Sequence, residues 1–508
     1  MIALALALLL QAPPTYDALV ARGIAEARDG RTDAAAETLG RAIALDPRRP
    51  EALVERGGLR FLQRRYDDAI DDLQDALRVK DDAYARDLLA STLLLTGRND
   101  PAIREWNRVG KPALGKVKIV GLRHGEESSV RRELTFDEGQ PLEIDDYRRT
   151  RLRLEETGFF DTVEMRPVVT GPGKIDLEIA VLERHGFGNM RQLAVRGAVD
   201  LTRRKVRLRY VNLGNRFTVG GEYKWEASQP FLGGTVDVFR PLGFPGMVSI
   251  EGLRSRPSYD FEDGTGPFRL RTIGGGVRGR VVVAPRTVAE AGLRVRDRTY
   301  DATRADTHEG RLVGVQAGLD HTFWAGRRHD LVGSIRTLSA PGALGSDVSF
   351  TRVLGRVVHH LHVQRPDGIP IEHGSIAAQV TLGRGGDGMP LDEMFAPGAA
   401  SEMEFPLRAH RQKTSGVLGR TPIARSIALL NFEWRQRLFR APVGQLGYVL
   451  FYDGGRMGRT AQGGDVSLHD VGVGLRFGLR GAALLRADYA WSLTDGKSAL
   501  TAGIGQVF

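Results

Sequence analysis

The sequence predicts a multidomain protein: an all-α helical repeat, then one α+β domain, then a transmembrane antiparallel β-barrel of about 16 strands. Three observations predict this order. Small and apolar residues recur about every 33–34 residues near the N-terminus, and helix and strand patterns then alternate over about 70 residues. From residue 185 onward, apolar and polar residues alternate with a period of two.

Composition narrows the class of protein. After the N-terminus no run of 18 apolar residues occurs, which excludes a helical membrane protein. The chain has no cysteine, so a disulfide framework and a thiolate zinc site are also excluded. The net charge of +10 is the excess of 72 basic over 62 acidic residues. Of the basic residues, 63 are arginines and nine are lysines, a skew typical of GC-rich coding. We therefore expect no nucleic-acid partner. The basic residues could instead contact the phosphates of outer-membrane lipid.

The N-terminus predicts export. Residues 2–10 are apolar and Gln11-Ala-Pro-Pro follows them, so the run is too short to span a bilayer but suits a secretory signal. The positively charged residues that usually precede the apolar run of a signal sequence are missing, and only the α-amino group carries a positive charge there. We expect residues 1–13 to be a signal sequence, with a buried first helix as the alternative.

Residues 14–110 carry the repeat, whose spacing and small residues predict closely packed helix pairs. Its first copy contains Gly23, Ala35, Leu39, Ala42 and Pro47, which recur as Gly57, Ala69, Leu73, Ala76 and Asp81. The pattern resembles the tetratricopeptide repeat. Two functions fit it equally: a groove that docks a periplasmic protein partner, or a spacer that packs beside the next domain.

Residues 115–184 predict a small α+β domain with the order β-α-α-β-β. Strands are expected at 116–122, from 159 and at 174–183, and helices at 126–136 and 144–157. Gly158-Phe-Phe and Val181-x-Glu183 complete a pattern that resembles a POTRA (polypeptide-transport-associated) domain. The resemblance implies a periplasmic domain whose sheet edges bind extended chains, while a rigid collar for the barrel is the alternative.

Residues 185–508 predict the barrel. In the segments 428–435, 446–453, 471–480 and 485–491, every charge falls on one parity, and the opposite face carries aromatic side chains at its ends. This is typical of strands with one face in lipid and one in a polar lumen. Because backbone groups cannot stay unpaired in lipid, we expect the sheet to close.

Two short motifs carry a second resemblance. Phe451-Tyr-Asp-Gly-Gly455 fits the F-x-D-x-G strand motif of the BamA/TamA-like outer-membrane protein assembly and translocation superfamily, which includes two-partner-secretion transporters. Upstream, Leu407, Arg408, Ala409 and His410 stand where that family has an inward-folded loop with the pattern [V/I/L]-R-G-[F/Y]. The resemblance implies an ion pair between Arg408 and Asp453, and Ala409 and His410 depart from the pattern.

The C-terminus fits the same family. Leu500, Ala502, Ile504 and Phe508 are expected to share one face of the last strand, and the terminal Phe508 resembles an outer-membrane barrel signal. The resemblance implies a bacterial outer-membrane protein, with residues 14–184 in the periplasm, that inserts or translocates client polypeptides. The alternatives are a transporter of one dedicated passenger and a structural or pore protein.

No motif points to catalysis. In His359-His-Leu-His362, a strand would place the histidines on opposite faces. The segment Gly383-Arg-Gly-Gly-Asp-Gly388 lacks the lysine-Ser/Thr ending of a phosphate loop, so we expect it to form a hairpin. We therefore expect no enzyme, no cofactor and no metal.

Overall fold

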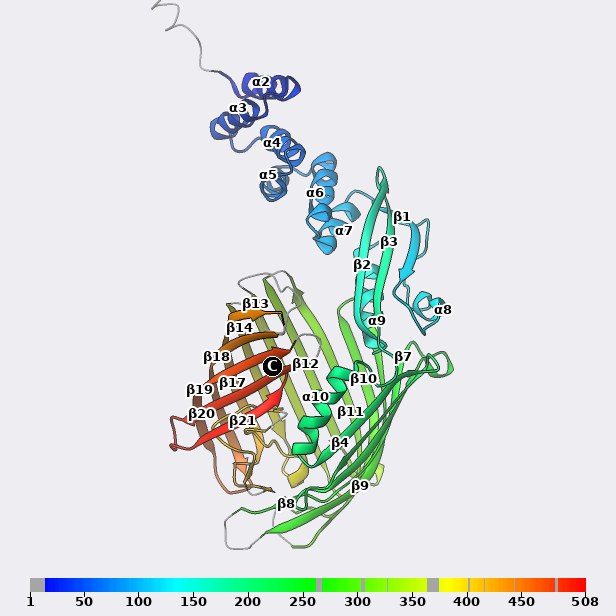
Figure 1. Cartoon of the computed structure of the whole chain (residues 1–508), viewed down its shortest axis with the longest axis vertical. Helices are drawn as coiled ribbons and strands as arrows, with labels where there is room; N and C mark the ends of the chain where they lie inside the picture. The colour runs from blue at the N-terminus through cyan, green and yellow to red at the C-terminus, as the bar shows by residue number, and fades with distance from the viewer. Residues whose placement is uncertain are drawn as a thin grey trace, which may run out of the picture. The chain divides into compact units, whose positions relative to one another are not determined.

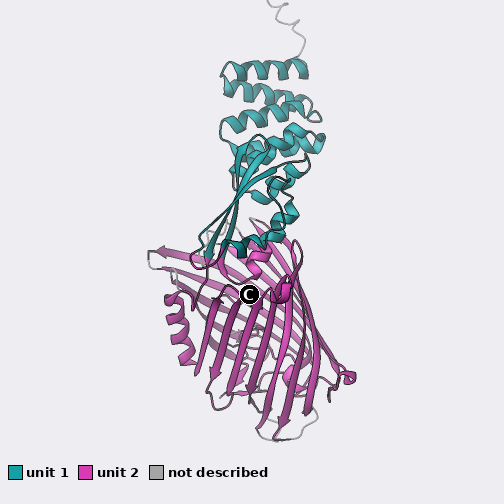
Figure 2. Cartoon of the chain, turned by 90° about the vertical axis from the view of Figure 1, so that its right-hand side faces the viewer, with its two compact units in different colours: residues 1–122, 127–151, 162–182 teal, residues 123–126, 152–161, 183–508 magenta. Residues whose placement is uncertain are grey.

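The computed structural model describes residues 14–508 except 262–266, 303–306, 327, 363–373, 401, 402, 415, 443 and 480–482. The expected signal sequence, residues 1–13, lies outside the described residues. The chain divides into two compact units (Figure 2). The first contains the helical region and most of the α+β domain, and the second contains the sheet that follows.

The N-terminal region contains consecutive helices, each packed on the next (Figure 1). They are α2 (Tyr16–Arg28), α3 (Thr32–Leu45), α4 (Glu51–Leu62), α5 (Tyr66–Val79), α6 (Ala83–Leu95) and α7 (Asn99–Asn107). A Cβ atom on Gly23 would lie 2.7 Å from Cγ of Leu39, and one on Gly57 would lie 2.9 Å from Cγ of Leu73. The recurring glycine thus lets each helix pair approach closely. The tetratricopeptide assignment itself stays a prediction.

The α+β domain has the expected order of elements. It contains β1 (Ala113–Val120), α8 (Glu127–Arg131), α9 (Ile144–Glu156), β2 (Phe160–Gly171) and β3 (Lys174–Glu183), with sheet order β1-β3-β2. The helix α8 is shorter than predicted, because the chain turns toward α9 after it. The backbone N–H of Thr135 donates to the Thr150 hydroxyl at 3.0 Å, and its own hydroxyl donates to the Asp146 carbonyl at 2.9 Å.

The second unit is a large antiparallel sheet of 18 strands, three of which have only two residues. The short strands β8, β15 and β16 form a side sheet, and β14 pairs with β17 across the loop of residues 386–423. The fifteen remaining strands come close in number to the sixteen that the sequence predicts. The sheet is not closed. The strands are β4 (Lys205–Leu213), β5 (Phe217–Lys224), β6 (Phe231–Phe239), β7 (Gly246–Ser255), β8 (Ser258–Tyr259), β9 (Phe268–Ala284), β10 (Thr287–Tyr300), β11 (Gly310–Ala325), β12 (His329–Ala340), β13 (Phe350–His362), β14 (Ser375–Gly385), β15 (Lys413–Thr414), β16 (Val417–Leu418), β17 (Ala424–Ala441), β18 (Gly444–Thr460), β19 (Val466–Leu479), β20 (Ala483–Ser492) and β21 (Ser498–Ile504).

Two local expectations were wrong. The sequence predicts no helix after residue 185, but Met190–Thr202 forms α10, whose first turn is capped by the Asn189 side chain. The stretch 383–388 is not a hairpin. It ends β14 and begins the 386–423 loop, because β14 pairs with β17 rather than with the segment that follows it.

The alternation of charged and apolar residues correctly predicted which side chains lie on the outer and the inner face of the sheet. Phe432 and Leu475 are 40% and 57% exposed on the outer face, whereas Glu433 and Arg476 are fully buried on the inner face. Within the described part of the chain, no helix is long and apolar enough to cross a membrane.

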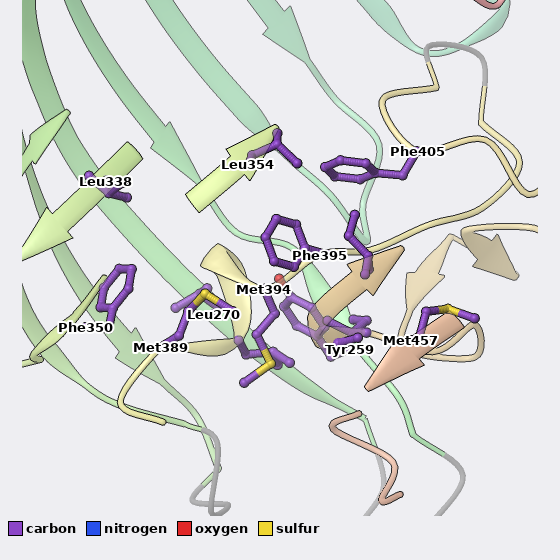
Figure 3. Packing of buried hydrophobic residues seen from close by; sticks show 14 of the residues in the cluster. Tyr259, Leu270, Leu338, Phe350, Leu354, Met389, Met394, Phe395, Phe405 and Met457 are labelled. Carbon is purple, nitrogen blue, oxygen red and sulfur yellow. The ribbon is translucent and has the colours of Figure 1, made fainter. Parts of the chain in front are cut away.

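The 386–423 loop packs inside the sheet through an apolar cluster (Figure 3). Met389, Met394, Phe395 and Phe405 of the loop belong to one cluster with strand residues that include Leu354. The rings of Phe395 and Phe405 meet edge to face, with centroids 5.7 Å apart. Burial of these side chains removes apolar surface from water and so favours the folded-in loop.

We predict that Gly57→Ala destabilises the helical region by about 1–3 kcal/mol, because the added methyl overlaps Leu73. Thermal unfolding followed by circular dichroism at 222 nm measures the change. The control is Gly58→Ala in the same helix, where the nearest atom would lie at 3.8 Å. That control should be neutral or stabilising, because alanine favours a helix over glycine. Equal melting curves for the two variants would contradict the close approach of the helices.

Candidate functional site

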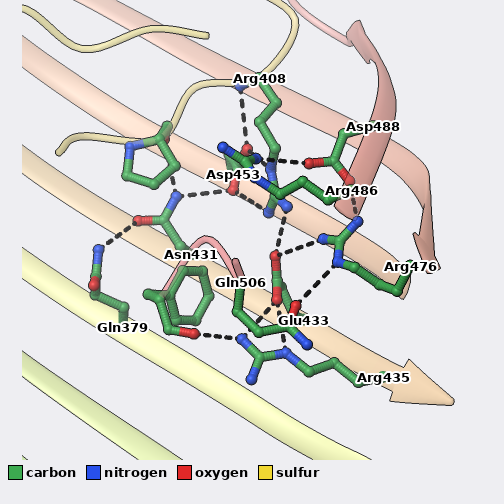
Figure 4. Close-up of polar contacts among 12 residues, drawn as sticks. Gln379, Arg408, Asn431, Glu433, Arg435, Asp453, Arg476, Arg486, Asp488 and Gln506 are labelled. Atoms are coloured by element: carbon green, nitrogen blue, oxygen red, sulfur yellow. Dashed lines mark hydrogen bonds and ion pairs between the residues drawn. The ribbon is translucent and has the colours of Figure 1, made fainter. Parts of the chain in front are cut away.

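Arg408 lies at the centre of a buried charge network inside the barrel (Figure 4). Its Nε atom donates to Oδ2 of Asp453 at 2.7 Å, and its Nη2 atom donates to Oδ1 at 2.8 Å. The backbone N–H of Arg408 also donates to Asp453, at 3.2 Å. Neither side chain is exposed. The structure thus places the loop arginine against the β18 aspartate, which is the pair that the family resemblance implies.

Three more side chains complete the surroundings of Arg408. Its Nη1 atom donates to Oε1 of Glu433 at 2.6 Å, and the guanidinium carbon lies 3.5 Å from the centre of the Phe451 ring. The side-chain amide of Asn431 donates to Oδ1 of Asp453 at 2.8 Å and to the Pro406 carbonyl at 2.9 Å. A planar guanidinium suits this site, because it can stack on a ring and bind two carboxylates at once.

The network extends along the inner wall. Arg435 donates to Glu433 at 2.8 Å, while Arg476 and Arg486 donate to Asp488 at 2.5 and 3.0 Å. With His410 and Lys497, six cationic side chains pair with five carboxylates. The cations are Arg408, His410, Arg435, Arg476, Arg486 and Lys497, and the carboxylates are Glu433, Asp453, Asp470, Asp488 and Asp495. Each carboxylate has a cationic partner, which offsets the cost of taking its charge out of water.

His410, which replaces the aromatic residue of the family pattern, has charged partners of its own. Its Nδ1 and Nε2 atoms lie 3.1 Å from carboxylate oxygens of Asp470 and Asp495, respectively. Carboxylates only accept hydrogen bonds, so both ring nitrogens must donate, which requires the imidazolium form. Burial lowers the pKa of His410, but its hydrogen bond to Asp470 and the nearby negative charges outweigh this, and the pKa is raised overall. The backbone N–H of Ala409 also donates to Asp470, at 2.8 Å.

Gly455 and Leu407 lie where the loop meets the wall. Leu407 is fully buried, and a Cβ atom on Gly455 would lie 2.5 Å from Cδ2 of Leu429 and 3.6 Å from the methyl groups of Leu407. A side chain at position 455 would therefore overlap Leu429 of β17, while its contact with Leu407 of the loop would be an ordinary van der Waals contact.

Phe508 differs from its expected position. The strand β21 ends at Ile504, so Phe508 does not share the outer face of that strand. Its carbonyl accepts from Arg435 at 2.5 Å, and the Arg435 guanidinium lies 5.7 Å from its ring centre. The chain leaves the sheet after Ile504 because Gly505 has a positive φ of 85°. The role of Phe508 as a barrel signal stays a prediction.

The alternation of polar and apolar residues could predict which other members of the network face the inside of the barrel, but not which side chains pair with each other. Asn431, Glu433 and Arg435 alternate with apolar residues in β17, which places them on the inner face. Nothing local in the sequence connects Asp470 or Asp495 with His410, because they lie 60 and 85 residues away from it.

Among the described residues, one group has the composition of a metal site. Ligand-type atoms of His124, Glu183 and His185 lie within 4.8 Å of one another. However, the Glu183 carboxylate already accepts from the backbone N–H groups of Arg123 and His124 and from the Asn212 side chain. This arrangement fits a carboxylate that ties two chain segments together.

Comparisons with known proteins agree with this architecture. Residues 112–184 match a POTRA model described as surface antigen variable number repeat, and residues 286–508 match the Omp85 superfamily domain. The chain thus carries a POTRA domain followed by an Omp85 superfamily domain. These two domains indicate an outer-membrane β-barrel protein of bacteria with a periplasmic POTRA domain.

One solved structure shares the fold at low identity, and a second shows a weaker overall similarity. CdiB from Escherichia coli matches with a TM-score of 0.52 and 13% identity, over 77% of this chain and 75% of that one. BamA from Haemophilus ducreyi lacking POTRA domains 1–3 matches with a TM-score of 0.46 and 13% identity, over 77% of this chain and 84% of that one. No curated protein sequence matches.

We predict that Arg408→Ala lowers the stability of the folded barrel by about 3–5 kcal/mol, because it leaves Asp453 and Glu433 buried without their shared cation. The shift from folded to unfolded mobility on heating, followed by gel electrophoresis, measures the loss. Arg411→Ala is the matched control, since Arg411 is exposed in the same loop. Equal transition temperatures for the two variants would show that the pair does not stabilise the barrel.

We further predict that the His410 contacts weaken at high pH. A raised pKa means that the imidazolium stabilises the fold fully below the unfolded pKa of about 6.5, and that this stabilisation is lost as pH rises through the folded pKa. The transition temperature of the wild-type barrel should fall as the pH rises above about 6.5 and through the raised folded-state pKa. In His410→Gln this fall should be smaller, and an identical fall would assign it to other groups.

Proposed function

We propose that the protein inserts polypeptides into the bacterial outer membrane or translocates them across it. The observation that carries the proposal is the Omp85 domain whose 386–423 loop is held inside the barrel by Arg408, Asp453 and Glu433. A buried anchor of this kind favours one conformation of the loop, so the loop presents a defined surface inside the barrel.

The POTRA domain supplies a sheet edge for a client in extended form. The outer edge of β1 is occupied, because Leu114 exchanges hydrogen bonds with Gln140 and Gly139 and the Arg131 side chain donates to the Val117 carbonyl. On the other side of the sheet, β2 is the edge strand, and Val168 and Val169 are exposed there. An extended chain can add to such an edge through backbone hydrogen bonds, with little regard to its sequence.

The helical repeats are proposed to bind a periplasmic protein partner. They connect firmly to the POTRA domain within the same unit: Arg148 donates to Asp100 at 2.8 Å, and the Asn107 side chain donates to the Leu142 carbonyl at 2.9 Å. A partner held by the repeats would therefore be held close to the POTRA sheet.

Members of the Omp85 superfamily are transporters or assembly factors, and we propose that this chain likewise has no catalytic activity. Transport of one dedicated passenger and a purely structural role remain the competing functions. No feature of the described residues favours either over the assembly or translocation of several clients.

Depletion of the protein followed by quantification of the outer-membrane proteome tests the proposal. An assembly factor should lower many β-barrel proteins at once, a dedicated transporter should lower a single secreted passenger, and a structural protein should lower neither. Complementation with Arg411→Ala should restore the wild-type proteome, and Arg408→Ala should restore it only in part. An unchanged proteome and secretome after depletion would contradict the proposal.

A further inference from the structure

A cluster of two histidines and one carboxylate lies at the end of β3. His124, Glu183 and His185 each offer one ligand-type atom, and these three atoms lie within 4.8 Å of one another. All three residues belong to the second compact unit. The imidazole rings of His124 and His185 are stacked, with centroids 4.3 Å apart and planes 8° from parallel. Two ring nitrogens and a carboxylate oxygen are thus gathered in one small volume.

The Glu183 carboxylate ties this cluster together and has one acceptor position left. Its Oε2 atom accepts from the backbone N–H groups of Arg123 and His124, both at 2.8 Å, and its Oε1 atom accepts from the Asn212 side chain at 3.0 Å. A carboxylate has about four lone-pair positions, and these hydrogen bonds occupy three of them. The carboxylate can therefore still bind a cation, and burial of its side chain limits competition from water.

Two buried polar atoms beside this carboxylate have no hydrogen-bond partner within the part of the chain that the structure describes. They are Nδ1 of His185 and Oδ1 of Asn212. Asn212 is 3% exposed, and its amide nitrogen donates to Glu183, so its amide oxygen lies close to the same carboxylate. Buried polar atoms without a partner are unfavourable. A metal ion satisfies both atoms: the imidazole nitrogen binds the ion, and a water molecule on the ion donates to the amide oxygen.

The donor set selects the class of ion. Imidazole nitrogen suits zinc, copper, iron and nickel ions, whereas calcium and magnesium ions prefer oxygen ligands. Two histidines and a glutamate hold zinc in open sites, where water is the fourth ligand. Ligands of one tetrahedral zinc ion stand about 3.4 Å apart, so the cluster must contract by no more than about 1.4 Å. His124 can supply this movement, because its side chain is 57% exposed.

We propose that His124, Glu183 and His185 bind one divalent ion of the zinc class, whose bound water is held by Asn212. The ion joins residues 123–126 to the end of β3 and to the end of β4. The sequence predicts no metal, because 59 residues separate His124 from Glu183 and no motif spans such a distance. This inference does not rest on the proposed function.

Zinc titration of the full chain, purified without a polyhistidine tag, tests the site. A chromogenic chelator that competes for Zn²⁺ reports both the affinity and the number of ions bound. We expect one ion per chain, which an excess of Mg²⁺ or Ca²⁺ does not displace. Absence of saturable Zn²⁺ binding by the wild-type chain would overturn the proposal and would leave a bridging water as the partner of the two buried atoms.

His124→Ala and His185→Ala each remove one ligand. Loss of a group that only orients a metal ligand weakens binding about 10–100-fold, so removal of a ligand itself should cost at least about tenfold in affinity. The matched control is His359→Ala, because His359 belongs to a second close pair, with its Nε2 atom 3.3 Å from Nδ1 of His329. That control should bind the ion as the wild type does.

The variants are compared as barrels that keep heat-modifiable mobility. Unchanged affinity in both His124→Ala and His185→Ala, or loss of the ion in His359→Ala alone, would overturn the proposal.

Cobalt gives a second measurement on the wild-type chain, which keeps the proposal testable where a variant fails to fold. Co²⁺ held by nitrogen ligands in a four-coordinate site absorbs visible light far more strongly than hydrated Co²⁺. We expect this absorption to appear with one equivalent of Co²⁺ and to disappear when Zn²⁺ is added. The weak spectrum of the hydrated ion, or a strong one that Zn²⁺ does not abolish, would overturn the proposal.

Discussion

The architecture of the barrel depends on one buried cation. Arg408 reaches from a loop to two carboxylates on neighbouring strands, and none of the three side chains is exposed. Taking these charges out of water is costly, and the cost is offset only while every partner is in place. The interaction therefore specifies one position of the 386–423 loop rather than merely adding stability.

The apolar cluster around Phe395 and Phe405 acts together with this network. Apolar packing tolerates small shifts of a loop, whereas a guanidinium bound at two points to Asp453 does not. The cluster thus contributes most of the burial, and the charges set the register of the loop against β17 and β18. Ala409 and His410 fit the same scheme, because Asp470 accepts from the backbone N–H of Ala409 and from the ring of His410.

The opposite side of the barrel lacks such an anchor. Near β21 the inner wall is held by Arg435, Arg476 and Arg486, but between β4 and β21 side-chain contacts run through α10 and Arg203. Side-chain contacts such as these hold a sheet edge less firmly than a ladder of backbone hydrogen bonds. The sheet is therefore rigid where the loop is anchored and adaptable where its first and last strands meet.

By itself, the sequence determined the order of the three domains, the faces of the C-terminal strands and the closely packed glycines of the repeats. These features rest on periodicity, which is a local property of the chain. Family motifs added the Arg408–Asp453 pair. Only the tertiary structure decided which side chains share Asp470, where Phe508 lies and how residues 190–202 fold. Those outcomes depend on partners 60 or more residues away. No local rule reports whether such a partner is there.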